Sequence, residues 1–387
     1  MKDLRATTLA ILDDLVAHPT VTSDSNLDLI DEAAARLENA GASLVTTYDE
    51  DGDKANLFAT IGPEIDGGVV LSGHTDVVPA DDGEWTSDPF AVTRRDDRLY
   101  GRGTADMKGF IACTLALAPV FAAASLRVPV HIALTFDEEV GFRGAPVLLD
   151  ELGRTGPAPS AAIVGEPTCL RIVAAHKGCY EYTTTVTGVQ GHGSTPDAAV
   201  NAVEYGARYI CRLLELRAEL AGRAPSDSPF EPRESTISVG TVTGGTARNI
   251  VAGSCSLQWE LRPVQPADAD LVRDDLAAFE RELVAEMRRT HPDADVATVA
   301  VCEVDGLELV ETSAAVELGR RLLDDAEEDV VSFGTEAGLY QQAGIPAIVC
   351  GPGSIDVAHK PDEFVSVEQL DRCLDMLHRL GDRLTEV

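Results

Sequence analysis

The sequence predicts an α/β fold that carries a smaller inserted α+β domain, and two observations support this. Apolar runs typical of strands covered on both faces alternate with helical patterns near both ends of the chain. Between them the order of predicted elements becomes β-α-β-β-α-β. One of these strands alternates apolar and polar residues, as expected for a sheet with one solvent-exposed face. A chain of 387 residues is also long for one core, so about two domains are expected.

The first part of the chain shows the α/β pattern in order. Its periodicity predicts two helices, the second capped by Ser23 or Asp24, and then strands and a more apolar helix. The expected helices are Leu4–Ala17, Leu27–Ala40 and Phe110–Ala124, and the expected strands are Asn56–Ile61, Val69–Ser72, Val130–Phe136 and Ala161–Val164. Ligands of such sheets gather beyond the carboxyl ends of the strands, so polar residues there are the first site candidates.

The middle and last parts follow the same logic. The inserted pattern comprises strands Tyr180–Val186, Thr236–Gly240, Ser254–Leu261 and Val296–Val304 with helices Ala198–Leu220 and Asp268–Arg289. The α/β pattern resumes with helix Thr312–Leu323, strand Ile345–Cys350 and helix Val367–Leu384. We therefore expect a discontinuous domain at 1–173 and 306–387, interrupted by a second domain at 174–305.

The composition excludes several classes of protein. A net charge of −34 argues against a nucleic-acid or anionic-membrane partner, because phosphate would be repelled. Attraction of cationic substrates, a generic acidic surface and a high-salt habitat all remain open as explanations. The apolar helix contains Pro119 and is shorter than the ~20 residues that span a bilayer. With no signal-peptide pattern and eight cysteines lacking any C-x-x-C pair, we expect a cytoplasmic protein with free thiols.

Most of five potential metal ligands lie just past apolar runs. His74, Glu139 and Glu166 follow three predicted strands, His359 follows the last one, and Asp106 closes a glycine-containing loop. Mixtures of His and carboxylate suit Zn²⁺, with Co²⁺ or Mn²⁺ as substitutes. The sequence therefore predicts a metal site, and two ions are expected because a carboxylate such as Asp106 can bridge cations about 3.5–4 Å apart.

Nearby residues have alternative interpretations. The loop Gly101–Asp106 is close to a dinucleotide-binding loop, but it lacks the third glycine and its acid would repel pyrophosphate. Asp76, two residues after His74, could orient the imidazole from behind, although a lone His at a strand end is more often structural. Glu138 and Glu139 are adjacent, so one could bind metal while the other acts on water; an exposed acidic turn is the alternative.

Two further signals lie in the inserted pattern. His192 stands in the glycine-rich loop Gly191–Ser194, and no Ser-His-acid arrangement accompanies it. Arg262 and the pair Arg248-Asn249 could bind a substrate carboxylate, although an isolated arginine is more often a surface residue.

Taken together, the motifs resemble those of a known family. In order they are Gly73–Asp76, Tyr100–Gly109, Asp137–Glu139, Gly165–Thr168 and Ala358–Glu363. With them the chain resembles, over nearly its whole length, the dinuclear-zinc metallo-aminoacylases and carboxypeptidases of peptidase family M20. Weaker motifs make it most similar to the acetylornithine deacetylase group within that family; they are Trp85–Phe90, Ala175–Gly178, Gly334–Ala337 and Cys350–Ile355.

The resemblance implies a zinc-exopeptidase-like catalytic domain and an inserted, ferredoxin-like dimerisation or lid domain. It implies two ions with Asp106 shared between them, Glu138 as general base and Asp76 as the partner of His74. In the resulting homodimer, His192 would reach the partner subunit's site and stabilise the oxyanion. The implied ligands are His74, Asp106 and Glu166 for one ion and Asp106, Glu139 and His359 for the other.

The implied reaction is hydrolysis of an N-acyl amino acid, with N²-acetyl-L-ornithine as the first candidate substrate, as in arginine biosynthesis. The expected substrate-binding residues are Arg262, Asn249, Lys177, Thr335 and Glu336. Another amidohydrolase of the family, such as a succinyl-diaminopimelate desuccinylase or a general N-acyl-amino-acid hydrolase, is an alternative. A non-catalytic metal-binding protein on the same scaffold is a more distant one.

Overall fold

The protein is described by a computed structural model covering residues 2–80, 83–156, 158–324 and 327–386. The chain divides into two compact units. Unit 1 comprises residues 1–175, 307–330 and 335–387, and unit 2 comprises residues 176–306 and 331–334. The predicted mixed α/β class is confirmed.

Unit 1 is built on an eight-stranded sheet in the order β1-β2-β6-β3-β7-β16-β8-β15. Its four central strands β6, β3, β7 and β16 are mutually parallel, whereas the pairs β1–β2, β2–β6 and β16–β8 are antiparallel. Strands β3, β6 and β7 are buried along their whole length, which explains their continuous apolar runs. The strand bounds are β1 Ser43–Tyr48, β2 Ala55–Ile61, β3 Val69–His74, β6 Val130–Thr135, β7 Ala161–Pro167, β8 Ile172–His176, β15 Glu328–Val331 and β16 Ala347–Gly351.

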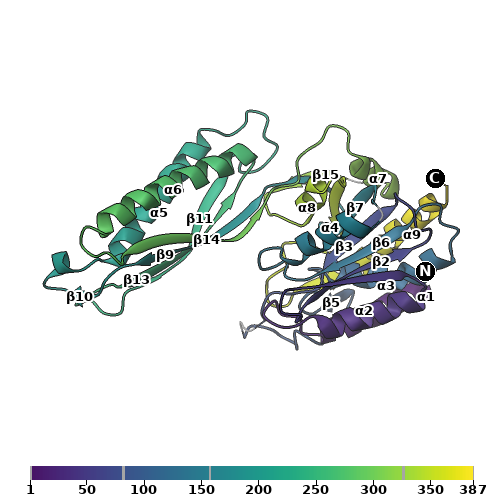
Figure 1. Ribbon diagram of the computed structural model, residues 1–387. Coiled ribbons are helices and arrows are strands. Elements are labelled where there is room, and N and C mark those ends of the chain that lie inside the picture. The colour runs from purple at the N-terminus through teal and green to yellow at the C-terminus, as the bar shows by residue number, and fades with distance from the viewer. Residues whose placement is uncertain (1, 81–82, 157, 325–326, 387) are drawn as a thin grey trace. The chain divides into compact units, whose positions relative to one another are not determined.

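Helices cover both faces of this sheet (Figure 1). Helices α1, α2, α3 and α9 pack together on one face, and α4 and α8 lie on the other. A small sheet of β4 (Thr93–Arg95), β5 (Arg98–Tyr100) and β17 (Phe364–Ser366) lies beside them. The helix bounds are α1 Lys2–Ala17, α2 Leu27–Asn39, α3 Lys108–Ala123, α4 Gly144–Thr155, α7 Ala314–Leu322, α8 Ala337–Gln342 and α9 Val367–Glu386.

The predicted cap of α2 is wrong. Neither Ser23 nor Asp24 caps this helix; its N-cap residue is Asn26, whose side chain makes no capping bond. Instead, the Asn26 amide donates to the carbonyl of Ala55 at 2.8 Å and its oxygen accepts from the Ala55 N–H at 2.9 Å. Asn26 therefore ties the start of α2 to strand β2, a long-range contact that local cap preferences do not reveal.

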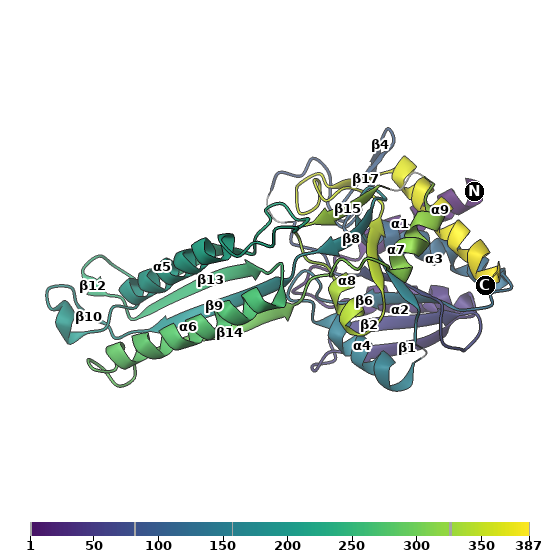
Figure 2. The same ribbon diagram turned by 90° about the horizontal axis from the view of Figure 1, so that it is seen from above.

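Unit 2 confirms the predicted β-α-β-β-α-β order. Its sheet has the order β11-β13-β9-β14, and both long helices lie on the same face of it (Figure 2). Tyr180, Tyr182 and Val186 on β9 alternate with more exposed residues and belong to the unit 2 core, as the period of two predicts. The bounds are β9 Cys179–Thr187, β10 Gly191–His192, α5 Ala202–Ala221, β11 Thr236–Gly244, β12 Ile250–Val251, β13 Ser254–Arg262, α6 Pro266–Met287 and β14 Asp295–Val304.

Two whole-chain expectations can be checked directly. All eight cysteines are free thiols, as expected, and Cys211 is the exposed one among them. No helix within the described ranges combines the length and the apolar character needed to cross a membrane.

Candidate metal centre

The predicted ligands meet at one edge of the unit 1 sheet. Because β3, β6, β7 and β16 are parallel, their carboxyl ends lie at the same edge. His74 ends β3, Glu138 and Glu139 follow β6, and Glu166 lies near the end of β7. His359 comes from the loop after β16.

His74 is held so that one ring nitrogen faces the acids. Its Nε2 lies 2.9 Å from Asp106 Oδ1 and 3.7 Å from Glu166 Oε1. On the other side of the ring, Nδ1 lies 2.9 Å from the backbone carbonyl oxygen of Asp76, closer than the 3.7 Å to the Asp76 carboxylate. A carbonyl can only accept, so Nδ1 carries the hydrogen and the lone pair of Nε2 is left for a ligand.

Asp106 faces both imidazoles. Its Oδ1 is the partner of His74, while its Oδ2 lies 3.3 Å from His359 Nε2. The same His359 nitrogen lies 2.9 Å from Glu139 Oε1. One carboxylate with an oxygen directed at each of two His residues is the geometry that a bridging ligand between two cations requires.

The Asp76 carboxylate has a role that the sequence did not indicate. Its Oδ1 accepts from the backbone N–H of Glu138 at 3.1 Å, and its Oδ2 accepts from that of Glu139 at 3.2 Å. Asp76 thus orients His74 with its carbonyl and fixes the turn bearing both glutamates with its side chain. Side-chain donor atoms of His74, Glu138 and Glu166 lie within 4.8 Å of one another, as do those of His74, Asp106 and Glu139.

A buried ion pair positions Asp106. Glu363 Oε1 accepts from the backbone N–H groups of Ala105 at 2.9 Å and of Asp106 at 3.1 Å. Its Oε2 accepts from the Arg102 guanidinium at 2.7 Å, and both side chains are at most 2% exposed. Neither Arg102 nor Glu363 has a local sequence pattern that predicts this role, although both lie within the family motifs.

The electrostatics match a cation-binding cluster. Burial, followed by the neighbouring carboxylates, raises the pKa values of Glu138 and Glu166 well above their ordinary range. Hydrogen bonds to Asp106 and Glu139 raise the pKa of His359 to about 10. Glu166 Oε1 is buried with no hydrogen-bond partner among the described residues. A dication among these groups would reverse the tendency of the acids to hold protons and would satisfy that oxygen, so the residue set fits metal ions.

Two expected substrate-binding residues are buried in unit 1. Thr335 Oγ1 accepts from the backbone N–H of Ala337 at the start of α8, at 3.1 Å. Glu336 is 1% exposed, and its Oε2 accepts from the Ser72 hydroxyl at 3.4 Å. Burial raises the pKa of Glu336 to about 7.

Another two lie at one end of unit 2. Lys177 is buried, and its ammonium donates to the carbonyls of Pro232 at 2.6 Å and Glu234 at 2.7 Å, so its charge already has partners. Arg262 ends β13 and donates to Glu260 Oε2 at 2.7 and 3.0 Å.

His192 and Asn249 lie together at the other end of the unit 2 sheet. His192 is exposed, its Nδ1 lies 2.7 Å from Ser194 Oγ, and the neighbouring Gly193 N–H donates to the Asn249 carbonyl at 2.9 Å. Strand β13 runs from Ser254, near this loop, to Arg262, and at ~3.3 Å per residue it separates them by about 26 Å. Within unit 2, His192 and Arg262 therefore cannot contact one small substrate.

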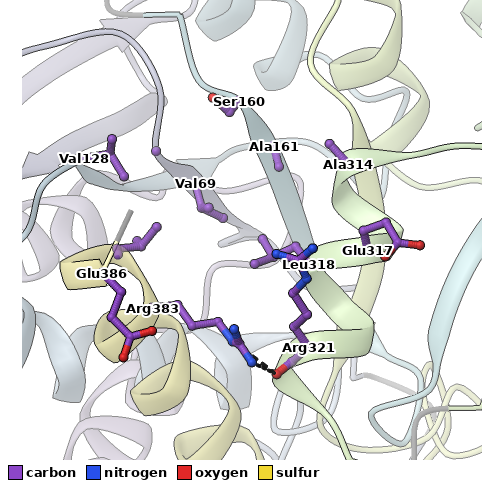
Figure 3. A pocket seen from close by; sticks show the side chains of 12 residues that line it. Val69, Val128, Ser160, Ala161, Ala314, Glu317, Leu318, Arg321, Arg383 and Glu386 are labelled. Atoms are coloured by element: carbon purple, nitrogen blue, oxygen red, sulfur yellow. Dashed lines mark hydrogen bonds between the residues drawn. The ribbon is translucent and has the colours of Figure 1, made fainter.

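A separate cavity of about 630 Å³ lies at the opposite edge of the unit 1 sheet (Figure 3). It is lined by Val69 and Ala161, the first residues of β3 and β7, and by Arg321 and Arg383. His74 is five residues further along β3, about 17 Å away at ~3.3 Å per residue. The cavity therefore does not belong to the cluster of candidate metal ligands, and its volume does not indicate where the catalytic residues lie.

The buried imidazole of His74 and the exposed imidazole of His359 lie beside several carboxylates at the carboxyl edge of an α/β sheet, an arrangement typical of metal-dependent hydrolases. Residues 70–383 match the model of peptidase family M20/M25/M40. The chain is 39% identical to the acetylornithine deacetylase of Myxococcus xanthus over 98% of both chains, and 35% identical to that of Pasteurella multocida over 95% of both.

A solved structure supports the same fold. The YXEP protein of Bacillus subtilis, described as a dinuclear metal-binding peptidase of the M20 family, superposes with a TM-score of 0.63 and 15% identity, covering 100% of this chain and 99% of that one. The chain belongs to peptidase family M20/M25/M40 and is a metal-dependent amidohydrolase.

Proposed function

We propose that this protein hydrolyses N²-acetyl-L-ornithine to L-ornithine and acetate. The observation that carries the proposal is Asp106 placed between His74 and His359, with Glu138 beside them. The 39% identity to an acetylornithine deacetylase over nearly the full chain supports the particular substrate. On this basis the protein would act in arginine biosynthesis, in the cytoplasm.

The five predicted ligands would hold two Zn²⁺ ions, with Co²⁺ or Mn²⁺ as substitutes. His74, Asp106 and Glu166 would hold one ion, and Asp106, Glu139 and His359 the other. When bound, such ions lower the pKa of water toward neutrality and polarise a carbonyl group. Proton transfer, stabilisation of the oxyanion and binding of the substrate are assigned to side chains of this protein.

Glu138 is the proposed general base. Its side chain lies among the ligands but is not needed to complete either set of three, which leaves its carboxylate for proton transfer. It would take a proton from the attacking water and then donate it to the nitrogen of the departing ornithine. Asp76, through the backbone N–H of Glu138, keeps this carboxylate in place.

We propose that His192 acts on the site of a second copy of the chain, in a homodimer formed through unit 2. His192 is exposed. The segments that connect the two units lie beside Gly306 and Gly334, at the end of the unit 2 sheet that carries Arg262, whereas His192 is at the other end. Its ring would donate to the oxyanion formed at the acetyl carbon, where a preorganised donor contributes about 3–4 kcal/mol.

Substrate recognition is proposed to rest on charge complementarity. Arg262 would bind the α-carboxylate with help from Asn249, and Glu336 or another acid would receive the side-chain ammonium. Because Arg262 and Asn249 lie at opposite ends of the unit 2 sheet, the two would have to come from different subunits. Lys177 and Thr335 hydrogen-bond backbone groups of their own units, which favours a role in positioning the local backbone.

A comparison of substrates tests the proposal. With metal content measured in parallel, kcat/KM for N²-acetyl-L-ornithine should exceed that for N-acetylmethionine and for succinyl-diaminopimelate. A clear preference for either of the last two would replace the proposed substrate by another amidohydrolase activity of the family. No hydrolysis of any of the three by fully metal-loaded protein would favour a non-catalytic metal-binding role.

A further inference from the structure

Three metal-binding side chains of unit 2 lie together, and none of them belongs to the proposed centre. Cys179 and Glu181 are on β9, and Cys302 is on the neighbouring strand β14. In the register of the two strands Cys302 is opposite Glu181, and Cys179 is two residues from Glu181, so the three side chains share one face. Their two sulfurs and one carboxylate oxygen all lie within 4.8 Å of one another.

These spacings suit a metal ion better than a disulfide. Two sulfurs bound at ~2.3 Å to a tetrahedral ion lie about 3.8 Å apart. The Sγ of Cys179 lies 3.9 Å from Glu181 Oε1, so movements of under about 1 Å would close the site around an ion. Cys179 is opposite Val304 and is therefore diagonal to Cys302; diagonal neighbours are about 7–8 Å apart, beyond the ~7 Å limit for a disulfide.

The surroundings balance the charge of an occupied site. Both cysteines are buried, at 2% and 7% exposure. Two thiolates and one carboxylate around a dication leave one net negative charge, and the neighbouring cation is the Arg262 guanidinium, which also donates to Glu260. Gly334, in the segment 331–334, packs against Cys179 and Arg262. A Cβ atom added to Gly334 would lie 2.9 Å from Cys179 Cβ and 3.6 Å from Arg262 Nη1.

We propose that Cys179, Glu181 and Cys302 bind a thiophilic divalent ion such as Zn²⁺, with water in the fourth position. The ion ties β9 to β14 at the end of the sheet that carries Arg262. The site shares no ligand with the centre in unit 1, and the proposed substrate-binding residue Arg262 lies beside it.

Cobalt titration of the full chain distinguishes the two kinds of site. After removal of metal by a chelator and full reduction of the thiols, Co²⁺ should produce a thiolate-to-cobalt charge-transfer absorption in the near ultraviolet. The centre in unit 1 has only imidazole and carboxylate ligands, so it cannot produce this absorption. At saturation the intensity should correspond to one thiolate-bound ion per chain, in addition to any ions held by unit 1. The absorption should remain in His74→Ala, which removes a ligand from unit 1.

Matched cysteine variants complete the test. Cys179→Ser and Cys302→Ser should each abolish the absorption and lower the bound metal by one ion per chain. Cys211→Ser, which changes the exposed thiol, should leave both unchanged. If circular dichroism shows that a serine variant has not folded, Glu181→Gln decides, because both thiols remain and the Co²⁺ binding curve should shift to higher concentration.

Three results would overturn the proposal. They are no charge-transfer absorption in the reduced chain, an absorption that survives in folded Cys302→Ser, and a Glu181→Gln binding curve that coincides with that of the unaltered chain.

Discussion

The two units differ in how they bury charge. Among the described residues, unit 1 buries many charged side chains around one edge of its sheet, including Asp106, Glu166 and Glu363, whereas unit 2 buries Lys177 and Asp268. Each of the latter two has several hydrogen-bond partners of its own. An unpaired buried charge is costly, so the cluster in unit 1 requires an explanation that the polar groups of unit 2 do not. The difference indicates that the buried carboxylates of unit 1 are the first place to test for catalysis.

The largest expected effect tests the unit 1 side of this comparison. Glu138→Gln keeps the size of the side chain but removes its basicity, so kcat should fall by at least the ~10²–10⁴ that general base catalysis contributes. Bound metal should be unchanged, because the five ligands remain. Glu50→Gln, which changes an exposed acid of the same unit, is the control. A kcat near that of the unaltered protein would refute the assignment of the base.

The next effect tests whether unit 2 contributes catalytically at all. His192→Ala should lower kcat by about 10²–10³ without loss of metal, as expected for removal of one oxyanion donor. His291→Ala changes another His of unit 2, which is partly buried, and should leave kcat unchanged.

The same variant tests the proposed dimer. When His192→Ala and Glu138→Gln chains are mixed and allowed to exchange, one site in each mixed dimer has both groups intact. Activity should then reappear. No recovery in mixtures shown to contain mixed dimers would exclude action across the subunits.

A smaller effect is expected from the residues that position Asp106. Glu363→Gln weakens the acceptor of the Ala105 and Asp106 N–H groups and leaves Arg102 without its ion pair. Metal affinity should fall by about 10–100-fold, typical of partners that orient a ligand. Added metal should restore most of kcat, which loss of a catalytic group would not allow. Glu368→Gln, an exposed acid nearby, should behave as the unaltered protein does.

Arg262 is expected to act on binding more than on turnover. Arg262→Ala should raise KM for acetylornithine by about tenfold or more, since a charge-assisted hydrogen bond contributes about 1.5–3 kcal/mol. Arg262→Lys should recover part of the loss, and Arg217→Ala on the surface of α5 should have no effect. An unchanged KM in Arg262→Ala would remove this residue from substrate recognition.

The central fold and the convergence of the candidate ligands could be predicted because their signals are local. The apolar runs of β3, β6 and β7 reflect burial on both faces, and His74, Glu139 and Glu166 stand at or just after the ends of these strands. Strand β1 was missed because it lies at a sheet edge with an exposed, polar sequence. The ion pair of Arg102 and Glu363 was missed because its partners are 261 residues apart and neither has a local signature. Lys177 has its charge satisfied by two carbonyls of a distant loop, and sequence cannot reveal such contacts.

The smallest expected effect concerns Glu336 and the preference for a cationic side chain. Glu336→Gln should lower the ratio of kcat/KM for acetylornithine to that for acetylmethionine by about two- to fivefold, the range of a screened ion pair. Because its pKa is raised to about 7, Glu336 loses its proton as the pH rises from 6 to 8. In the unaltered protein the preference should therefore increase over this range, and in Glu336→Gln it should stay flat. Parallel pH profiles in the two proteins would show that Glu336 supports Ser72 without contacting the substrate, and another acid would have to receive the ammonium.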